Sequence, residues 1–285
     1  MKKYSFVIDV AKCENCNNCF LSCKDEHCGN DWPGYSLSQP LHGQRWMNIS
    51  RKERGQFPFI DVAYLPKPCM HCDDAPCITA AENGAVYKRP DGIVLIDPEK
   101  AKWQKAIAGA CPYGAIWWNE EAQVPQKCTF CAHLLDKGWK APRCVQACPT
   151  GALSILHIDD EELAALVASE HLETLASEKM PTRPRVYYKN LHRFNNCIIV
   201  GSVATEDDGT TECVVGATVR LLKDSNILSQ QETDDFGDFK FDGLLEKSGS
   251  YELEVIFAGK TTRMETGKLQ QSCSVGTLWI ERASK

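Results

Sequence analysis

Hydrophobic and polar positions from residue 159 onward predict first a helix and then an extended segment. Leu166 and Val167 lie three and four residues after Leu163, behind an Asp159–Asp160 start, which predicts a surface helix. The segment PTRPRVYYKNLHRF that follows contains two prolines, which favour an extended backbone. We therefore expect a helix and an extended linker over residues 159–194.

From about Asn195 the pattern changes to short runs rich in valine, isoleucine and aromatic residues. The runs are CIIVGSV, CVVGATVRLL, SYELEVIF and GTLWIE, separated by turn clusters such as EDDGT, DDFGD and EKSGS. FGDFKF alternates as a half-buried strand does. The pattern predicts a small all-β domain over residues 195–285, a transthyretin-like or immunoglobulin-like antiparallel sandwich or barrel. It carries no recognisable chemistry, so we interpret it as a docking or capping module.

Composition and charge narrow the class of protein. The chain has 285 residues, enough for two domains, and its formal charge of −6 disfavours nucleic acid as the main partner. No apolar stretch is long enough to cross a bilayer, so we expect no direct membrane insertion. The N-terminal MKKYSFVIDV lacks a cleavage site and a twin-arginine pair. We expect a cytoplasmic protein, or one carried elsewhere by a partner that has the signal.

Cysteine is the residue that points to chemistry. The chain has sixteen, and thirteen of them lie between Cys13 and Cys148. A disulfide framework suits small secreted domains, which this chain does not resemble. The number and spacing of the cysteines therefore indicate a metal-binding scaffold.

These cysteines fall into four blocks. The blocks are Cys13-x2-Cys16-x2-Cys19-x3-Cys23; Cys69-x2-Cys72-x4-Cys77, with Ala81 where a fourth cysteine would fall; a third that keeps only Cys111, in CPYGA; and Cys128-x2-Cys131-x12-Cys144-x3-Cys148, followed by Pro149. In the bacterial ferredoxin run, three close cysteines bind one [4Fe–4S] cluster and the fourth binds a neighbouring cluster. Two such blocks therefore make two clusters by exchanging their last ligands.

This exchange rule predicts three clusters bound by twelve cysteines. The predicted ligand sets are Cys13, Cys16, Cys19 and Cys148; Cys23, Cys128, Cys131 and Cys144; and Cys69, Cys72, Cys77 and Cys111. A fourth cluster would need cysteines where the chain has Ala81, Ala101, Gln104 and Ile107. All four changes belong to one site, whereas random loss would leave clusters with three ligands. Zinc is the competing interpretation of CxxC pairs, but zinc sites rarely use a CxxCxxCxxxC run.

The remaining cysteines and the nearby histidines have simpler interpretations. We expect Cys197, Cys213 and Cys273 to be small buried residues, and Cys28 to lie outside every block. The histidines near the cysteine loops are His27, His42, His71 and His133, which we expect to be exposed or to pack rather than to tune potentials.

The four blocks, together with DGIVLIDPEK and CPYGA, resemble the iron–sulfur subunits of the molybdenum bis-pterin oxidoreductases related to dimethyl sulfoxide reductase. The resemblance covers roughly residues 1–190. It implies an α+β fold, in which residues 1–158 form a ferredoxin-like polycluster domain built from tandem bacterial-ferredoxin modules. It also implies a heterodimer with a large catalytic subunit that holds molybdenum, or tungsten, on two molybdopterin guanine dinucleotides. No nucleophile–base pair or phosphate loop is legible in this chain, so we expect no catalytic residue here.

The missing fourth cluster, the segments WPGYSLSQ, HGQRWMNISRKERG and RPRVYYKNLHRF, and the appended β domain narrow the resemblance to the transhydroxylases of this family. It then implies a partner that transfers hydroxyl groups between trihydroxybenzenes, from pyrogallol to phloroglucinol. Two alternatives stay open. One is the electron-conduit subunit of a related molybdenum reductase, such as a catechol dehydroxylase; the other is a stand-alone ferredoxin with a binding module.

Overall fold

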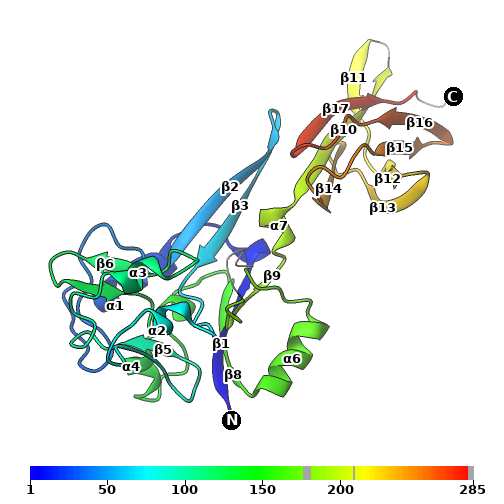
Figure 1. Cartoon of the computed structure of the whole chain (residues 1–285). Helices are drawn as coiled ribbons and strands as arrows, with labels where there is room; N and C mark the ends of the chain where they lie inside the picture. The colour runs from blue at the N-terminus through cyan, green and yellow to red at the C-terminus, as the bar shows by residue number, and fades with distance from the viewer. Residues whose placement is uncertain (176–180, 208, 282–285) are drawn as a thin grey trace. The chain divides into compact units, whose positions relative to one another are not determined.

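The computed structural model describes residues 1–175, 181–207 and 209–281, and residues 176–180 of the predicted helix-and-linker segment lie outside that description. The chain divides into two compact units (Figure 1). The cysteine unit comprises residues 1–51 and 64–191, and the β unit comprises residues 52–63 and 192 onward. Within the described residues, no helix is both long enough and apolar enough to cross a membrane.

A three-stranded sheet organises the cysteine unit, in the order β8–β1–β9. Strand β1 (Lys3–Asp9) pairs antiparallel with β8 (Leu153–Ile158) and parallel with β9 (Val186–Lys189). Phe6 and Ile8 of β1 are fully buried. Part of the segment predicted as an extended linker thus forms a sheet strand in the cysteine unit.

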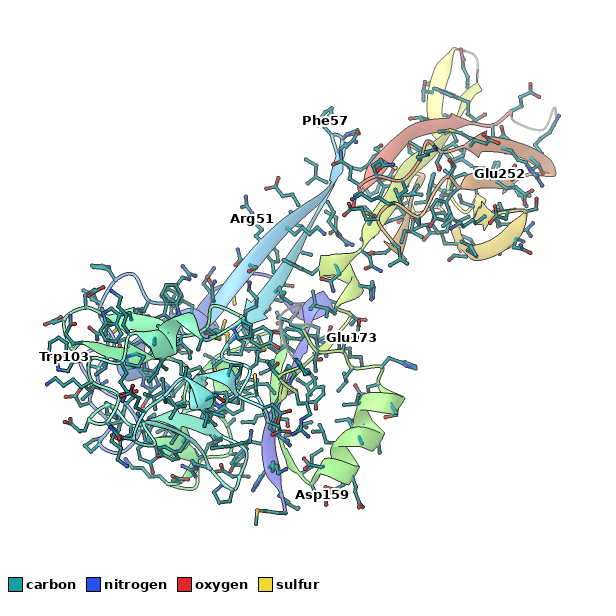
Figure 2. All side chains as sticks on the ribbon, viewed as in Figure 1. Arg51, Phe57, Trp103, Asp159, Glu173 and Glu252 are labelled. Carbon is teal, nitrogen blue, oxygen red and sulfur yellow. The ribbon has the colours of Figure 1, made fainter. Side chains whose placement is uncertain are left out.

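The predicted surface helix is confirmed as α6 (Asp160–Ser169). Asp159, labelled in Figure 2, caps it: its side chain accepts from the Glu161 and Glu162 amides, and the Glu162 side chain accepts from the Asp159 amide. Leu163 is the helix's buried residue.

Short helices and two-stranded hairpins carry the cysteine loops. The helices are η1 (Val10–Lys12), α1 (Asn18–His27), α2 (Pro76–Thr79), α3 (Ala106–Gly109), α4 (Ala132–Leu135) and α5 (Arg143–Gln146). The hairpins are β4 (Val86–Lys88) with β5 (Val94–Ile96), and β6 (Trp117–Asn119) with β7 (Val124–Gln126). All three residues of β5 are buried, as is Ile93 just before it, so this hairpin strand lies inside the unit.

The β unit contains two four-stranded sheets. In the first, β10 (Cys197–Asp207) pairs with β11 (Thr210–Cys213), β14 (Asp238–Leu244) and β17 (Cys273–Trp279). The second has the order β13 (Asn226–Glu232), β12 (Thr218–Lys223), β15 (Glu252–Phe257), β16 (Lys260–Glu265). Residues of both sheets share one hydrophobic core that includes Ile199, Val219 and Leu253, each fully buried. Strands at the five predicted runs are confirmed, but the β10–β17 pair is parallel, so a wholly antiparallel arrangement is wrong there.

A long hairpin, β2 (Asn48–Gln56) and β3 (Phe59–Lys67), contributes its tip, residues 52–63, to the β unit. There the Arg54 side chain, fully buried, forms ion pairs with Asp61 and with Asp242 of β14. The short helix α7 (His192–Asn195) leads into β10.

Candidate metal centres

Three CxxC loops share one backbone conformation. The residue just before the second cysteine has a left-handed φ in each loop: 56° at Asn15, 44° at His71 and 53° at Phe130. Such a φ is uncommon for a residue other than glycine. It turns the amide of His71 toward the sulfur of Cys69, and that of Phe130 toward the sulfur of Cys128, each at 3.4 Å.

In the first loop an amide likewise faces the first cysteine. Burial raises the pKa of Cys13, and a hydrogen bond from the Asn15 amide partly offsets that rise. In all three loops an amide N–H therefore faces the first thiol, an arrangement that favours the thiolate required of a metal ligand.

The two CP motifs also share a turn. Gly114 in CPYGA and Gly151 in CPTGA have φ of 62° and 64°. The amide of Ala115 donates to the sulfur of Cys111 over 3.4 Å. Burial alone would raise the pKa of Cys148, but hydrogen bonds from the Thr150 side chain and from the amides of residues 150, 152 and 153 bring it below the ordinary value.

The first predicted ligand set lies around one cavity. Its lining includes all four members, Cys13, Cys16, Cys19 and Cys148. Burial raises the pKa of Cys19 to about 12, and repulsion from Cys13, Cys16 and Cys148 adds to the rise. Cys148, from the fourth block, thus meets the cysteines of the first block in space.

The second set gathers cysteines from the first and fourth blocks. Cys23 and Cys144 are buried thiols whose pKa values burial raises well above the ordinary value. For Cys23, repulsion from Cys128 and Cys131 adds to the rise; for Cys144, repulsion comes from Cys131, Cys128 and Cys23. Four thiols from segments far apart in the chain therefore face one another.

The third set is assembled in the same way. Burial raises the pKa of Cys72 to about 12, with further repulsion from Cys69, Cys111 and Cys77. Burial also raises the pKa of Cys77 to about 11, against the attraction of Lys127. The structure brings Cys111 to the second block although the two are separated by the whole β4–β5 hairpin.

The donor chemistry of these sets fits iron–sulfur clusters. All sixteen cysteines are free of disulfides. Each predicted set would offer four soft thiols, and a bound cluster would keep them deprotonated. Among the described residues, no three histidine, cysteine or acidic side chains converge as ligands of a single metal ion.

Neighbouring sets adjoin one another. Cys19 of the first set contributes to the raised pKa of Cys144 in the second, after burial and the thiols of that set. Cys69 of the third set acts likewise on Cys128, and its backbone amide also donates to that thiol. The second set therefore lies between the first and the third.

The four positions that lack cysteine are filled by the chain's own side chains. Ala101 and Ile107 are fully buried. The amide group of Gln104 bonds to the backbone of Glu82 and of Lys100. Trp103, 69% exposed and labelled in Figure 2, has a φ of 70° at the position that Asn15 occupies in the first loop. The loop thus keeps the backbone conformation of a cluster loop without its ligands.

Several polar residues near the thiols gave no signal in the sequence. Thr182, 2% exposed, hydrogen-bonds the thiol of Cys72, and the Gln39 amide nitrogen lies 3.8 Å from the sulfur of Cys23. Lys127 is buried beside Cys128. Each comes from a segment whose local pattern is that of an ordinary loop, so only the assembled fold identifies it.

The histidines near the loops differ in exposure. His42 is exposed, whereas His27, His71 and His133 are buried. The Nδ1 atom of His71 accepts from the Val94 amide over 3.0 Å, and its ring packs against Phe130 at 3.7 Å between centroids. Packing is thus confirmed as a role for His71.

The cysteines outside the three sets also differ in exposure. Cys197 is buried and Cys273 half-buried, but the expectation of burial is wrong for Cys213. That residue lies on β11, whose four residues are all exposed. The sulfur of Cys28 lies 3.5 Å from the carbonyl oxygen of Pro40, outside the three sets.

Comparison with known proteins gives a consistent result. Residues 60–158 match a family model described as a 4Fe-4S dicluster domain. The chain is 49% identical over 264 residues to the pyrogallol hydroxytransferase small subunit of Pelobacter acidigallici, covering 92% of this chain and 93% of that protein. It is 34% identical over 202 residues to a sulfite dehydrogenase subunit of Allochromatium vinosum, covering 66% and 83%. It is 29% identical over 235 residues to the arsenate respiratory reductase iron–sulfur subunit of a Shewanella species, covering 65% and 95%.

Proposed function

Because the chain belongs to the family of iron–sulfur subunits that includes the pyrogallol hydroxytransferase small subunit, we propose that it serves a molybdenum bis-pterin enzyme that moves hydroxyl groups between trihydroxybenzenes. The observation that carries this proposal is the coherent pattern of ligands. By spacing, twelve cysteines form three predicted sets of four, while the four positions of a fourth set hold Ala81, Ala101, Gln104 and Ile107. The interactions between thiols within the three sets support this pattern. The identity of 49% over nearly the full length of both chains supports the assignment to this branch.

In this proposal twelve cysteines hold three [4Fe–4S] clusters. The first cluster is bound by Cys13, Cys16, Cys19 and Cys148, the second by Cys23, Cys128, Cys131 and Cys144, and the third by Cys69, Cys72, Cys77 and Cys111. Such clusters store and pass single electrons. The electrostatic interactions of Cys19 with Cys144 and of Cys69 with Cys128 support a relay through the protein in the order first, second, third.

The chain's own residues prepare these sites in two ways. Amides of the CxxC loops and of the CP turns donate to the thiols, which stabilises the thiolate form. Burial of Cys23, Cys131 and Cys144, with Cys128 half-buried, limits the access of water to the second set. Both effects come from residues of this chain and do not depend on the reaction in the partner.

The proposed partner is a large subunit that holds molybdenum on two molybdopterin guanine dinucleotides and contains the active site. Relatives of this chain are named as small subunits or electron-transfer subunits, which supports a division of labour between chains. We interpret the β unit's two sheets as a sandwich that serves docking or capping, because its core is formed by both sheets and contains no thiol set of its own among the described residues.

Hydroxyl transfer between ring positions is redox-neutral in sum, so the clusters would prime or buffer the metal rather than carry a steady current. The second candidate is the electron-conduit subunit of a related reductase. The replacement of the fourth ligand set favours the transhydroxylase subunit over the electron conduit. A relay that lacks one cluster reaches less far toward an external electron donor.

The test is an anaerobic iron and acid-labile sulfide count on the full chain purified with its native partner, with molybdenum and tungsten measured in the same sample. We expect about twelve irons per copy and close to one molybdenum or tungsten. Conversion of pyrogallol without added reductant would support the transhydroxylase, whereas a requirement for a stoichiometric electron donor would support the conduit. Sixteen irons, or zinc in their place, would contradict the ligand assignment.

A further inference from the structure

Lys127 is a buried cation that the cluster ligands do not explain. It follows β7 directly and precedes Cys128, and it is only 2% exposed. Its Nζ donates to the carbonyl oxygens of Val94, at 2.5 Å, and Cys128, at 3.1 Å. Both acceptors are neutral, so its hydrogen bonds leave its charge unbalanced.

Burial of a lone ammonium group is costly unless an opposite charge lies close to it. Within the described part of the chain, no carboxylate forms an ion pair with Lys127. The acidic groups around it are thiols. Lys127 bonds the backbone of Cys128 in the second set, and its other acceptor, Val94, donates its amide to Nδ1 of His71, in the Cys69–Cys72 loop of the third set, at 3.0 Å. In agreement with this position, Lys127 acts to lower the pKa of Cys77, Cys111 and Cys128 against the larger effect of burial.

The position of Lys127 is thus shared by two sets. Cys128 lies beside it in the chain, and Cys69 of the third set in turn donates its amide to the thiol of Cys128. The first set adjoins the second through Cys19 and Cys144 instead. One cation therefore lies beside the junction of the second and third sets.

We propose that Lys127 is the common countercharge of the second and third clusters and raises the reduction potential of both. This inference rests on the proposed function, because it requires clusters at those sets. Reduction adds a negative charge to a cluster, and a buried positive charge nearby stabilises the reduced form more than the oxidised form. Lys127 is then a positioning and tuning residue, which touches no substrate.

Lys88 provides a matched control. Its Nζ donates to the carbonyl oxygens of His71, at 3.3 Å, and Cys72, at 2.9 Å, so it also contacts a cluster loop. It differs in forming an ion pair with Asp73 at 2.8 Å. Its charge is therefore balanced locally, and its removal should have a smaller effect on the potential than removal of Lys127.

The experiment compares K127R, K127Q, K127M and K88Q in the full chain, purified anaerobically with its native partner. Iron is counted in each, and potentials are measured by redox titration followed by electron paramagnetic resonance. In K127Q and K127M we expect two of three potentials to fall, each by about tenfold in the reduction equilibrium, or about 59 mV for one electron. In K127R, which keeps the charge, and in K88Q, each reduction potential should change by less than half of that amount.

The outcomes separate this inference from the proposed function. Full iron with unchanged potentials in K127Q and K127M would overturn the role of Lys127 and leave the three clusters in place. Loss of iron from both neutral variants would also overturn it, because Lys127 would then be needed to hold the loop rather than to tune the clusters. A wild-type iron count far from twelve would refute the proposed function itself.

Discussion

The side-chain amide of Gln104 binds the backbone of Glu82 with both of its ends. Its Oε1 accepts from the Glu82 amide at 2.8 Å, and its Nε2 faces the Glu82 carbonyl oxygen at 3.4 Å. The same nitrogen donates to the carbonyl of Lys100 at 2.7 Å. Gln104 therefore ties together two loops that a fourth cluster would otherwise join.

The first prediction follows from the backbone kept at Trp103. Trp103, with a φ of 70°, keeps the left-handed backbone that Asn15, His71 and Phe130 have at the same position of the CxxC loops. We expect the variant A81C/A101C/Q104C/I107C to bind an additional cluster, with iron rising from about twelve to about sixteen per chain after anaerobic reconstitution.

The matched control is A81S/A101S/Q104S/I107S, which makes similar changes in size without providing thiolates. Its iron content should stay at about twelve. If the cysteine variant folds and gains no more iron than the serine variant, the four positions do not form one site.

The second prediction tests the exchange of ligands between blocks. C148A should damage the cluster of Cys13, Cys16 and Cys19, whose cavity Cys148 lines. C111A should damage the third cluster alone, because its neighbours are Cys69 and Cys72. Iron counts and the paramagnetic resonance signals of the reduced protein identify which cluster is affected.

Cys213 offers a control, since it is exposed on β11 and lies in none of the sets. C213A should leave all three signals intact. Loss of the second cluster's signal in C148A, with the first retained, would show that the last cysteine of the fourth block binds within its own block.

The three ligand sets stay a prediction from cysteine spacing, which reflects the geometry of a small cube, and the interactions between the thiols agree with that prediction. Arg54 could not be identified in this way. An arginine in a charged hairpin usually lies at the surface, and its partner Asp242 is 188 residues away. The same applies to Lys127, whose burial depends on residues of another hairpin.

The exposed strands were missed for a different reason. Every residue of β11 is exposed, and β13 has one residue that is not, so neither shows the alternation that identifies a half-buried strand. The parallel pairing of β9 with β1 also has no local signal, because the two strands are far apart in the chain. Local patterns predicted the strands that contribute to the core and not their partners.

The third prediction concerns the ion pairs of Arg54. Its buried guanidinium bonds to Asp61, and its Nη1 lies 2.7 Å from Asp242. R54M removes the ion pair that Arg54 forms with Asp242, whereas Asp61 keeps ion pairs with Arg193 and Lys240. Because the lost pair has a fully buried guanidinium, we expect a loss of about 3 kcal/mol in the free energy of unfolding of the β unit. The loss is measured by unfolding the full chain with denaturant. Protease cleavage at sites after residue 192 reports unfolding of the β unit.

Arg220 on β12 serves for comparison, since it is more exposed and Glu254 keeps a second partner in Arg263. R220M should cost less than about 1 kcal/mol. Equal losses in the two variants would contradict a special role for the buried arginine.

The last prediction concerns two neutral side chains that hydrogen-bond different ligands. Thr182 bonds the thiol of Cys72, and its hydroxyl lies 2.5 Å from that of Tyr113. The Gln39 amide nitrogen lies 3.8 Å from the sulfur of Cys23. Hydrogen bonds to the sulfurs stabilise the reduced cluster, so T182V should lower the potential of the third cluster and Q39L that of the second.

Each shift should be about 40 mV, the equivalent of about 1 kcal/mol for one neutral hydrogen bond. The two variants control for one another, because each leaves the other cluster's bond in place, and both should keep a full iron count. Redox titration distinguishes the cases: if T182V and Q39L move the same cluster, Cys23 and Cys72 do not belong to separate sets.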